Sequence, residues 1–203
     1  MKHNAKITAI LLVMFVVSQL IGIYVVNHYL SASNPLPFGM DSPKIEKQSD
    51  YVNIFPSIII AFVFAILLFF LLSKFKVQMI LRVWFFTVVV IALSIFFFSL
   101  TSSFDKVLYS IPVIATLIAL PLAVIKIYGR NFIVHNATEL FIYPGIAAVF
   151  VPLLNVWTII ALLIIISIYD AWAVWHSGIM QKMAKYQINE LKIFSGFFIP
   201  YAS

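Results

Sequence analysis

Residues 164–175 read IIISIYDAWAVW and contain Asp170, the one carboxylate of the chain that is set well inside an apolar run. The run extends over residues 156–179, which is long enough to cross a bilayer as a helix of about 20 residues. An ionisable side chain in hydrocarbon costs about 2.5–3.5 kcal/mol even on lenient insertion scales, so such residues mark functional sites by default. Asp170, preceded by Tyr169, is therefore the first candidate site residue.

The composition assigns the whole chain to the membrane class. Of its 203 residues 64% are hydrophobic and 20 are phenylalanine, and the mean hydropathy is +1.09, which soluble domains do not reach. The absence of cysteine excludes disulfides and thiolate metal sites. The sequence predicts an all-α fold, a single transmembrane domain over residues 1–203 that forms a polytopic bundle of six helices in the lipid bilayer.

Six apolar runs bounded by charges or turn residues are the predicted spans. They cover about residues 7–30, 54–72, 79–100, 107–128, 138–153 and 156–179. Residues 31–53 are expected to form an external loop, because its prolines and Gly39 argue against regular structure. Residues 180–203 are expected to form a cytoplasmic segment.

The charges of the connections predict the orientation. With six spans, ten of the 13 basic residues fall on one side of the membrane. These ten are Lys2, Lys6, Lys74, Lys76, Arg82, Lys126, Arg130, Lys182, Lys185 and Lys192. An excess of Lys and Arg marks the cytoplasmic side, so both termini are predicted to be cytoplasmic. The net charge of +6 is then a topology signal, and no nucleic-acid partner is expected because the basic residues are not clustered with exposed aromatics.

Helical phase and depth place Asp170 within the predicted sixth helix. A rotation of about 100° per residue puts it in a broad sector of mostly small or polar residues. That sector contains Leu163, Ile166, Ser167, Asp170, Ala173, Val174, Ser177 and Gly178. The side opposite carries Ile165, Ile168, Trp172 and Trp175. Small and hydroxyl-bearing residues face other helices or a wet cavity, and a rise of about 1.5 Å per residue puts Asp170 in the cytoplasmic half. Asp170 is expected to face protein or water there.

The pair Tyr169-Asp170 near the cytoplasmic end of a sixth span resembles the Tyr-Asp motif of presenilin-type intramembrane aspartyl proteases, particularly their archaeal homologues. The likeness extends to PGIAAVF at residues 144–150, to the turn LLN at 153–155, and to HSGIM at 176–180 with the basic tail that follows. Helix count and orientation agree along the whole chain.

The resemblance implies hydrolysis of peptide bonds inside the membrane by two aspartates, of which Asp170 would be one. The second would lie in a Gly-x-Gly-Asp motif on a seventh helix. Two nearby carboxylates share a proton, so one acts as base on a water while the other donates to the scissile carbonyl. A coupled pair titrates as a unit, so neither role is assigned to Asp170. Tyr169 would border the cavity or anchor its helix at the interface.

The 203 residues contain neither Gly-x-Gly-Asp nor the Pro-Ala-Leu motif of the family. The resemblance therefore implies an amino-terminal part, inactive alone, whose partner is a carboxy-terminal half with the second aspartate. The amino-terminal lysines favour the presenilin-like branch over the inverted signal peptide peptidases. Single-pass membrane proteins would be the substrates, in the cell membrane of an archaeon or an endomembrane of a eukaryote. No cofactor is expected.

Two other functions remain open for Asp170. It would be a titrating relay in a proton- or ion-coupled transporter or channel subunit, although neither paired broken helices nor an inverted repeat is clear. Alternatively, it would be structural in a non-catalytic scaffold.

The remaining polar residues predict no further chemistry. No metal site is expected, because the histidines lie near the ends of different spans without His-x-x-x-His spacing. Glu139 is interpreted as part of a boundary ion pair close to Arg130 and His135.

Overall fold

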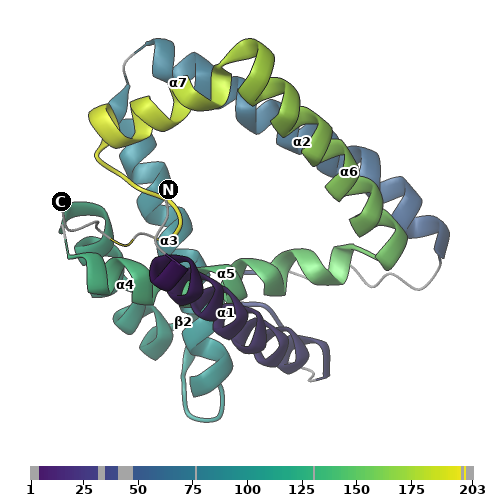
Figure 1. Ribbon diagram of the computed structural model, residues 1–203. Helices are drawn as coiled ribbons and strands as arrows, with labels where there is room; N and C mark the ends of the chain where they lie inside the picture. Colours follow the sequence, from purple (N-terminus) through teal and green to yellow (C-terminus); the bar gives the residue numbers. More distant parts are fainter. Residues whose placement is uncertain are drawn as a thin grey trace. The chain divides into compact units, whose positions relative to one another are not determined.

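The computed structural model describes residues 5–31, 35–40, 48–75, 77–129, 131–197 and 199. In these ranges the backbone is almost entirely helical, and the strands form one short hairpin (Figure 1). The α-helices are α1 (Ala5–Ser31), α2 (Gln48–Lys74), α3 (Gln78–Thr101), α4 (Val113–Tyr128), α5 (Phe132–Phe150), α6 (Val156–Trp172) and α7 (Ile179–Tyr186). The predicted all-α class is confirmed.

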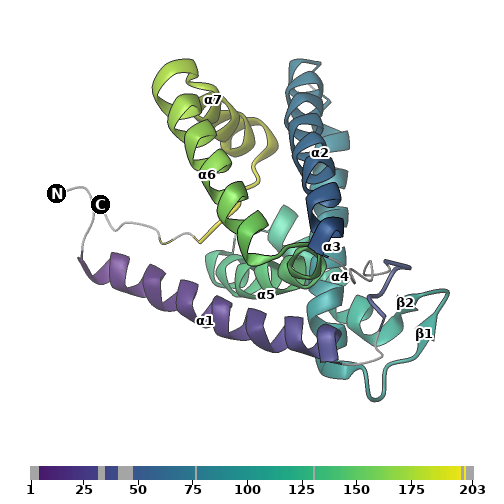
Figure 2. The same cartoon turned by 90° about the vertical axis from the view of Figure 1, so that its right-hand side faces the viewer.

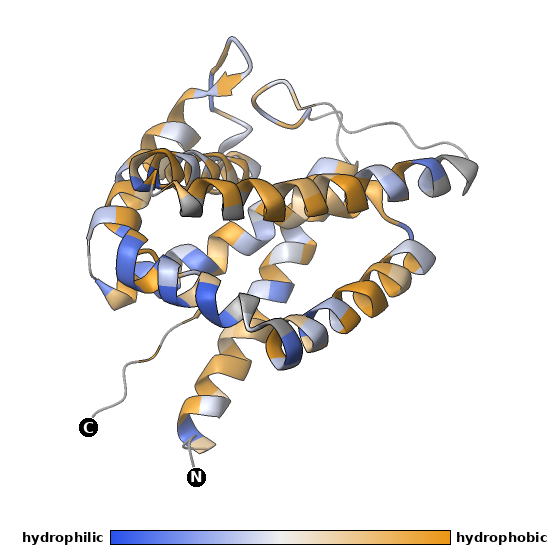
Figure 3. Cartoon of the chain, turned by 90° about the horizontal axis from the view of Figure 1, so that it is seen from above, coloured by the Kyte–Doolittle hydropathy of each residue, from blue (hydrophilic) through white to orange (hydrophobic). Residues whose placement is uncertain are grey.

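Among the described residues, four helical stretches are long and apolar enough to cross a membrane. They are Ala5–Leu30, Gln78–Thr101, Phe132–Leu153 and Val156–His176. Asn53–Leu68 and Val113–Tyr128 are apolar but shorter. Figure 3 shows that the long helical stretches consist mostly of apolar residues. Large apolar side chains such as Leu20 and Leu67 stay exposed, and lipid is the environment that accommodates such surfaces. The chain is a multi-pass membrane protein.

The chain divides into two compact units. Unit 1 comprises Met1–Ser42, Phe85–Phe150 and Ser195–Ser203, and unit 2 comprises Pro43–Trp84 and Val151–Phe194. Unit 1 therefore contains α1, most of α3, α4 and α5, whereas α2, α6 and α7 belong to unit 2. The candidate residues on α6 are positioned by the elements of unit 2.

The core of unit 1 lies where α1, α3 and α5 pack. α1 lies along α5 (Figure 2), and the rings of Phe96 on α3 and Phe141 on α5 stack with centroids 4.5 Å apart. A Cβ added at Gly145 would collide with the backbone carbonyl of Ala92. Glycine is required at this crossing because small residues let membrane helices approach closely.

Residues 107–112 form a β-hairpin, although hydropathy assigns them to a fourth span of residues 107–128. The hairpin consists of β1 (Val107–Leu108) and β2 (Ile111–Pro112). Tyr109 and Ser110 between the strands have φ angles of 48° and 64°, which do not occur in a right-handed helix. The residue before a proline is also disfavoured in helix. α4 accordingly begins only at Val113.

α5 begins at Phe132 and not at residue 138, where hydropathy starts the fifth span. The Asn131 side chain caps this helix, because its Oδ1 accepts hydrogen bonds from the amides of Ile133 and Val134 at 2.9 and 3.3 Å. The cap makes the polar residues before 138 part of the helix.

α2 begins at Gln48, inside the predicted external loop of residues 31–53. No proline or glycine occurs between residues 44 and 55, so nothing in the end of that loop interrupts a helix. Residues 35–40 form no helix or strand, and residues 32–34 and 41–47 of the predicted loop lie outside the described residues.

Candidate functional site

Tyr169 and Asp170 lie in the last turn of α6. Asn155 and Thr158 hold the first turn with a capping box, in which Asn155 Oδ1 accepts from the Thr158 amide at 2.8 Å and Thr158 Oγ1 accepts from the Asn155 amide at 2.9 Å. No proline or glycine follows until Gly178. The helix therefore runs without interruption from its cap to the candidate residues.

The α-helical backbone ends at Trp172, two residues after Asp170. The Ala173 amide donates to the carbonyls of both Tyr169 and Asp170, and Ala173–Ser177 form the π-helical turn η2. Gly178 ends this turn with a φ of 60°, a left-handed conformation that glycine adopts without steric cost. π-Turns occur frequently at functional sites. The chain thus leaves α6 through non-standard backbone within one turn of the candidate carboxylate.

The Asp170 side chain is half-buried, and its carboxylate makes no hydrogen bond or ion pair within the described ranges. Ala173, one turn further on the same side, is fully buried, whereas Ile168 and Trp172 on the opposite side are exposed. Leu163, Ser167 and Val174 are exposed too, although helical phase groups them with Asp170. The sector predicted to be sheltered is therefore mostly exposed or half-buried, and Ala173 is its fully buried member among the described side chains.

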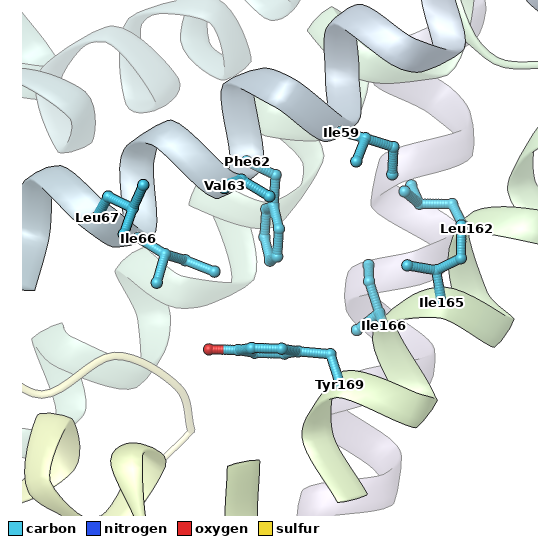
Figure 4. A pocket seen from close by; sticks show the side chains of 9 residues that line it. All are labelled: Ile59, Phe62, Val63, Ile66, Leu67, Leu162, Ile165, Ile166 and Tyr169. Carbon is cyan, nitrogen blue, oxygen red and sulfur yellow. The ribbon is translucent and has the colours of Figure 1, made fainter. Parts of the chain in front are cut away.

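A cavity of about 180 Å³ lies between α2 and α6 of unit 2 and reaches Tyr169 (Figure 4). It is lined by Ile59, Phe62, Val63, Ile66, Leu67, Leu162, Ile165, Ile166 and Tyr169. The Tyr169 ring extends from α6 towards α2 (Figure 4) and meets the Phe62 ring edge to face, with centroids 6.5 Å apart. Asp170 is the next residue along the helix and does not line the cavity.

The chemistry of this site follows from its composition. The aliphatic and aromatic walls accommodate apolar side chains, and they present no polar surface to the cavity. Asp170 is a single carboxylate, and acid–base hydrolysis of an amide by carboxylates needs two. In the parts of the chain that the structure describes, no group of three or more His, Cys, Asp or Glu side chains is placed to hold a metal ion.

A second titratable cluster, in unit 1, differs from the boundary pair expected from sequence. The partner of Glu139 is Lys126 on α4, with 2.6 Å between Nζ and Oε1, and both side chains are 4% exposed. His135 Nε2 lies 3.9 Å from the same oxygen, and Arg130 is outside the described residues. The sequence analysis did not pair Lys126 with Glu139, because Lys126 lies in the preceding helix. The signal that could have indicated this pair is the position of Lys126 near the end of α4, a short distance along the chain from the start of α5.

Comparison with protein families matches residues 11–203 to the family described as signal-peptide peptidase, presenilin aspartyl protease. The match covers most of the chain, including Tyr169 and Asp170. Neither the curated proteins nor the solved structures give a significant match. A family match of this extent, on a chain of apolar helices, identifies the class of protein: the chain belongs to the family of signal-peptide peptidases and presenilin aspartyl proteases, which act within membranes.

Proposed function

We propose that this chain supplies Asp170 as one of the two catalytic aspartates of an intramembrane protease. The observation that carries the proposal is a carboxylate inside an apolar helix that has no partner within the described ranges. A carboxylate in an apolar helix costs free energy, so its presence there indicates a function. Its place beside an apolar cavity and a π-turn adds support.

The other carboxylates whose side chains the structure describes have structural partners. Asp105 accepts hydrogen bonds from two amides of the first turn of α4, at 2.8 and 2.9 Å, which caps that helix. Glu190 accepts from Gln78 Nε2 at 2.9 Å, and Glu139 pairs with Lys126. Among the carboxylates whose side chains the structure describes, Asp170 is the one without such a partner and is therefore the one proposed to be catalytic.

The proposed reaction needs a second carboxylate, supplied by a segment with Gly-x-Gly-Asp that these 203 residues do not contain. The charged member of the pair takes a proton from water, and the water oxygen attacks the scissile carbonyl carbon. The protonated member donates to the carbonyl oxygen, which gives a tetrahedral diol. The carboxyl that took the water proton then donates it to the amide nitrogen as the C–N bond breaks, and one hydroxyl of the diol returns a proton to the other carboxylate, which leaves the pair singly protonated.

The proposed substrates are single-pass membrane proteins, and the proposed orientation has both termini in the cytoplasm, as in the presenilin-like branch. The charge asymmetry of the connections supports this orientation. The hydrogen bonds of Gly196 to His135 and Glu139 fit the proposed six-span arrangement, in which these two segments lie on the same side of the membrane. We assign Tyr169 to the wall of the cavity, where apolar substrate side chains would be received.

The proposal is tested by cleavage of a single-pass reporter in membranes that contain this chain and a carboxy-terminal half with Gly-x-Gly-Asp. Asp170→Asn is expected to abolish cleavage while the two halves still co-purify. Glu190→Gln is the matched control, because it makes the same chemical change at an exposed carboxylate of unit 2, and it should leave cleavage unchanged. Undiminished cleavage by the Asp170→Asn protein would remove Asp170 from the mechanism.

Membership of the protease family favours this function over the transporter and scaffold alternatives. A titrating relay would still explain an isolated intramembrane acid, and it makes a different prediction. Liposomes containing the chain alone would then show proton flux that Asp170→Asn removes, whereas the protease proposal expects no flux.

A further inference from the structure

The Lys126–Glu139 cluster makes contacts beyond the ion pair itself. Lys126 Nζ lies 3.3 Å from His135 Nδ1. His135 Nε2 is 2.8 Å from the carbonyl oxygen of Gly196, and the Gly196 amide donates to Glu139 Oε1 at 3.1 Å. Both the amide N–H and the carbonyl oxygen of Gly196 are thus hydrogen-bonded. Recognition of this kind reads the main chain of the segment rather than its side chains.

The hydrogen-bond directions fix the state of the histidine. A carbonyl oxygen only accepts, so His135 Nε2 carries the proton in the contact with Gly196. Nδ1 then carries no proton and accepts a hydrogen bond from the Lys126 ammonium group. Glu139, with Lys126 beside it, is the acceptor for the Gly196 amide. The three side chains therefore act together, and each orients a neighbour towards the bound backbone.

The residues beside Gly196 extend the contact. The rings of Tyr143 and Phe197 meet edge to face, with centroids 5.5 Å apart. His135, Glu139 and Tyr143 are spaced four residues apart on α5, so they form one stripe along that helix. Gly196 has a φ of 113°, a conformation restricted to glycine in practice. The bound segment thus needs a glycine, and an aromatic residue after it adds a ring contact with Tyr143.

The site lies beside the segment of the chain that follows α6, which is called the connection below. Gly196 follows α7 and the π-turn η3 (Gln187–Leu191) in the chain. In unit 2 the same connection is held by Arg82, whose Nε and Nη2 donate to the carbonyls of Leu191 and Glu190 at 3.1 and 3.2 Å. Contacts in unit 1 and in unit 2 therefore each hold a different part of the connection.

We propose that Lys126, His135, Glu139 and Tyr143 form a peptide-binding site whose ligand is a segment with the pattern glycine–aromatic. Residues 195–197 of the same chain occupy it. Its role is to fasten the connection downstream of α7 to the ends of α4 and α5. This role is independent of the catalytic assignment of Asp170.

The absence of cysteine permits a direct test by site-specific cross-linking. Tyr143→Cys with Phe197→Cys introduces one cysteine pair across the site, and a short bifunctional thiol reagent joins the two in membranes. The proposal expects an intramolecular cross-link. Adding Lys126→Met and Glu139→Leu, which replace the buried pair by apolar residues, should lower its rate by about tenfold or more, because a hydrogen bond to a charged acceptor is lost.

A second cysteine pair serves as the matched control. Phe96→Cys with Phe141→Cys spans the stacked rings of α3 and α5 in the same unit, so its cross-linking should not change in the Lys126→Met/Glu139→Leu protein. Gly196→Ala supplies an independent variant that leaves α4 and α5 untouched. It should lower cross-linking of the 143–197 pair because alanine does not adopt a φ of 113°.

The proposal is overturned if the 143–197 cross-link forms at the parental rate in both altered proteins. It is also overturned if cross-linking of that pair yields only dimers, because the occupant would then be the segment of a second copy.

Discussion

Glu139 and Asp170 are two carboxylates in apolar helices, and their surroundings are opposite. Glu139 is 4% exposed and lies 2.6 Å from the Lys126 ammonium, and it also accepts from the Gly196 amide. Asp170 is half-buried and has no partner within the described ranges. Buried charges persist in proteins when they are paired and hydrogen-bonded. The difference therefore separates a carboxylate that holds the structure from one that is available for a reaction.

The largest expected effect on stability comes from removing the charge of Glu139. Glu139→Gln leaves the Lys126 ammonium buried without a counter-charge, and breaking a buried pair in this way costs about 3–5 kcal/mol. Unfolding by SDS titration in mixed micelles would measure the loss. A loss below about 1 kcal/mol in the free energy of unfolding would contradict this expectation, because Glu139 would then contribute no more to stability than Asp170.

Replacing both members of the pair should restore most of that loss. In Lys126→Met/Glu139→Leu no charge is left unpaired, and apolar replacements of buried ion pairs are often neutral or stabilising. The free energy of unfolding is expected within about 1 kcal/mol of the parent. Non-additivity of this size in a double-mutant cycle identifies the two residues as one unit, and simple additivity would contradict it.

Around Asp170, stability should depend on apolar contacts. Tyr169→Ala removes the ring that meets Phe62 and enlarges the α2–α6 cavity. An aromatic pair contributes about 0.5–1.5 kcal/mol beyond its buried area, so a loss of about 1 kcal/mol or slightly more is expected. Tyr169→Phe, which retains the ring, should be neutral in the same titration. An equal loss in both proteins would assign the effect to the hydroxyl.

The smallest expected loss of stability is that of Asp170→Asn. The Asp170 carboxylate has no partner to lose within the described ranges, and a charge in an apolar helix is itself costly, so the free energy of unfolding should not fall by more than about 0.5 kcal/mol. A loss as large as that of Glu139→Gln would show that Asp170 has a structural partner and would remove the basis of its catalytic assignment.

Hydropathy predicted the membrane class and the helical fold, because both depend on apolar composition summed over long segments. The starts of α4 and α5 differ from the starts of the hydropathy spans, since helix starts are decided locally by the left-handed residues Tyr109 and Ser110 and by the Asn131 cap. Asp170 could be proposed as a site residue from sequence because its apolar neighbours are adjacent in the chain. The partner of Glu139 was not, because the Lys126 contact joins two helices and has no local signature.

The cleavage rate of the assembled protease tests directly whether Asp170 is the catalytic carboxylate of this chain. With a carboxy-terminal half present, the rate for a single-pass reporter is measured for the parent, Asp170→Asn and Glu190→Gln. The account predicts a loss of about 10³-fold or more for Asp170→Asn, because a catalytic acid or base is removed, and a parental rate for Glu190→Gln. A parental rate for Asp170→Asn, with both halves assembled, would contradict it.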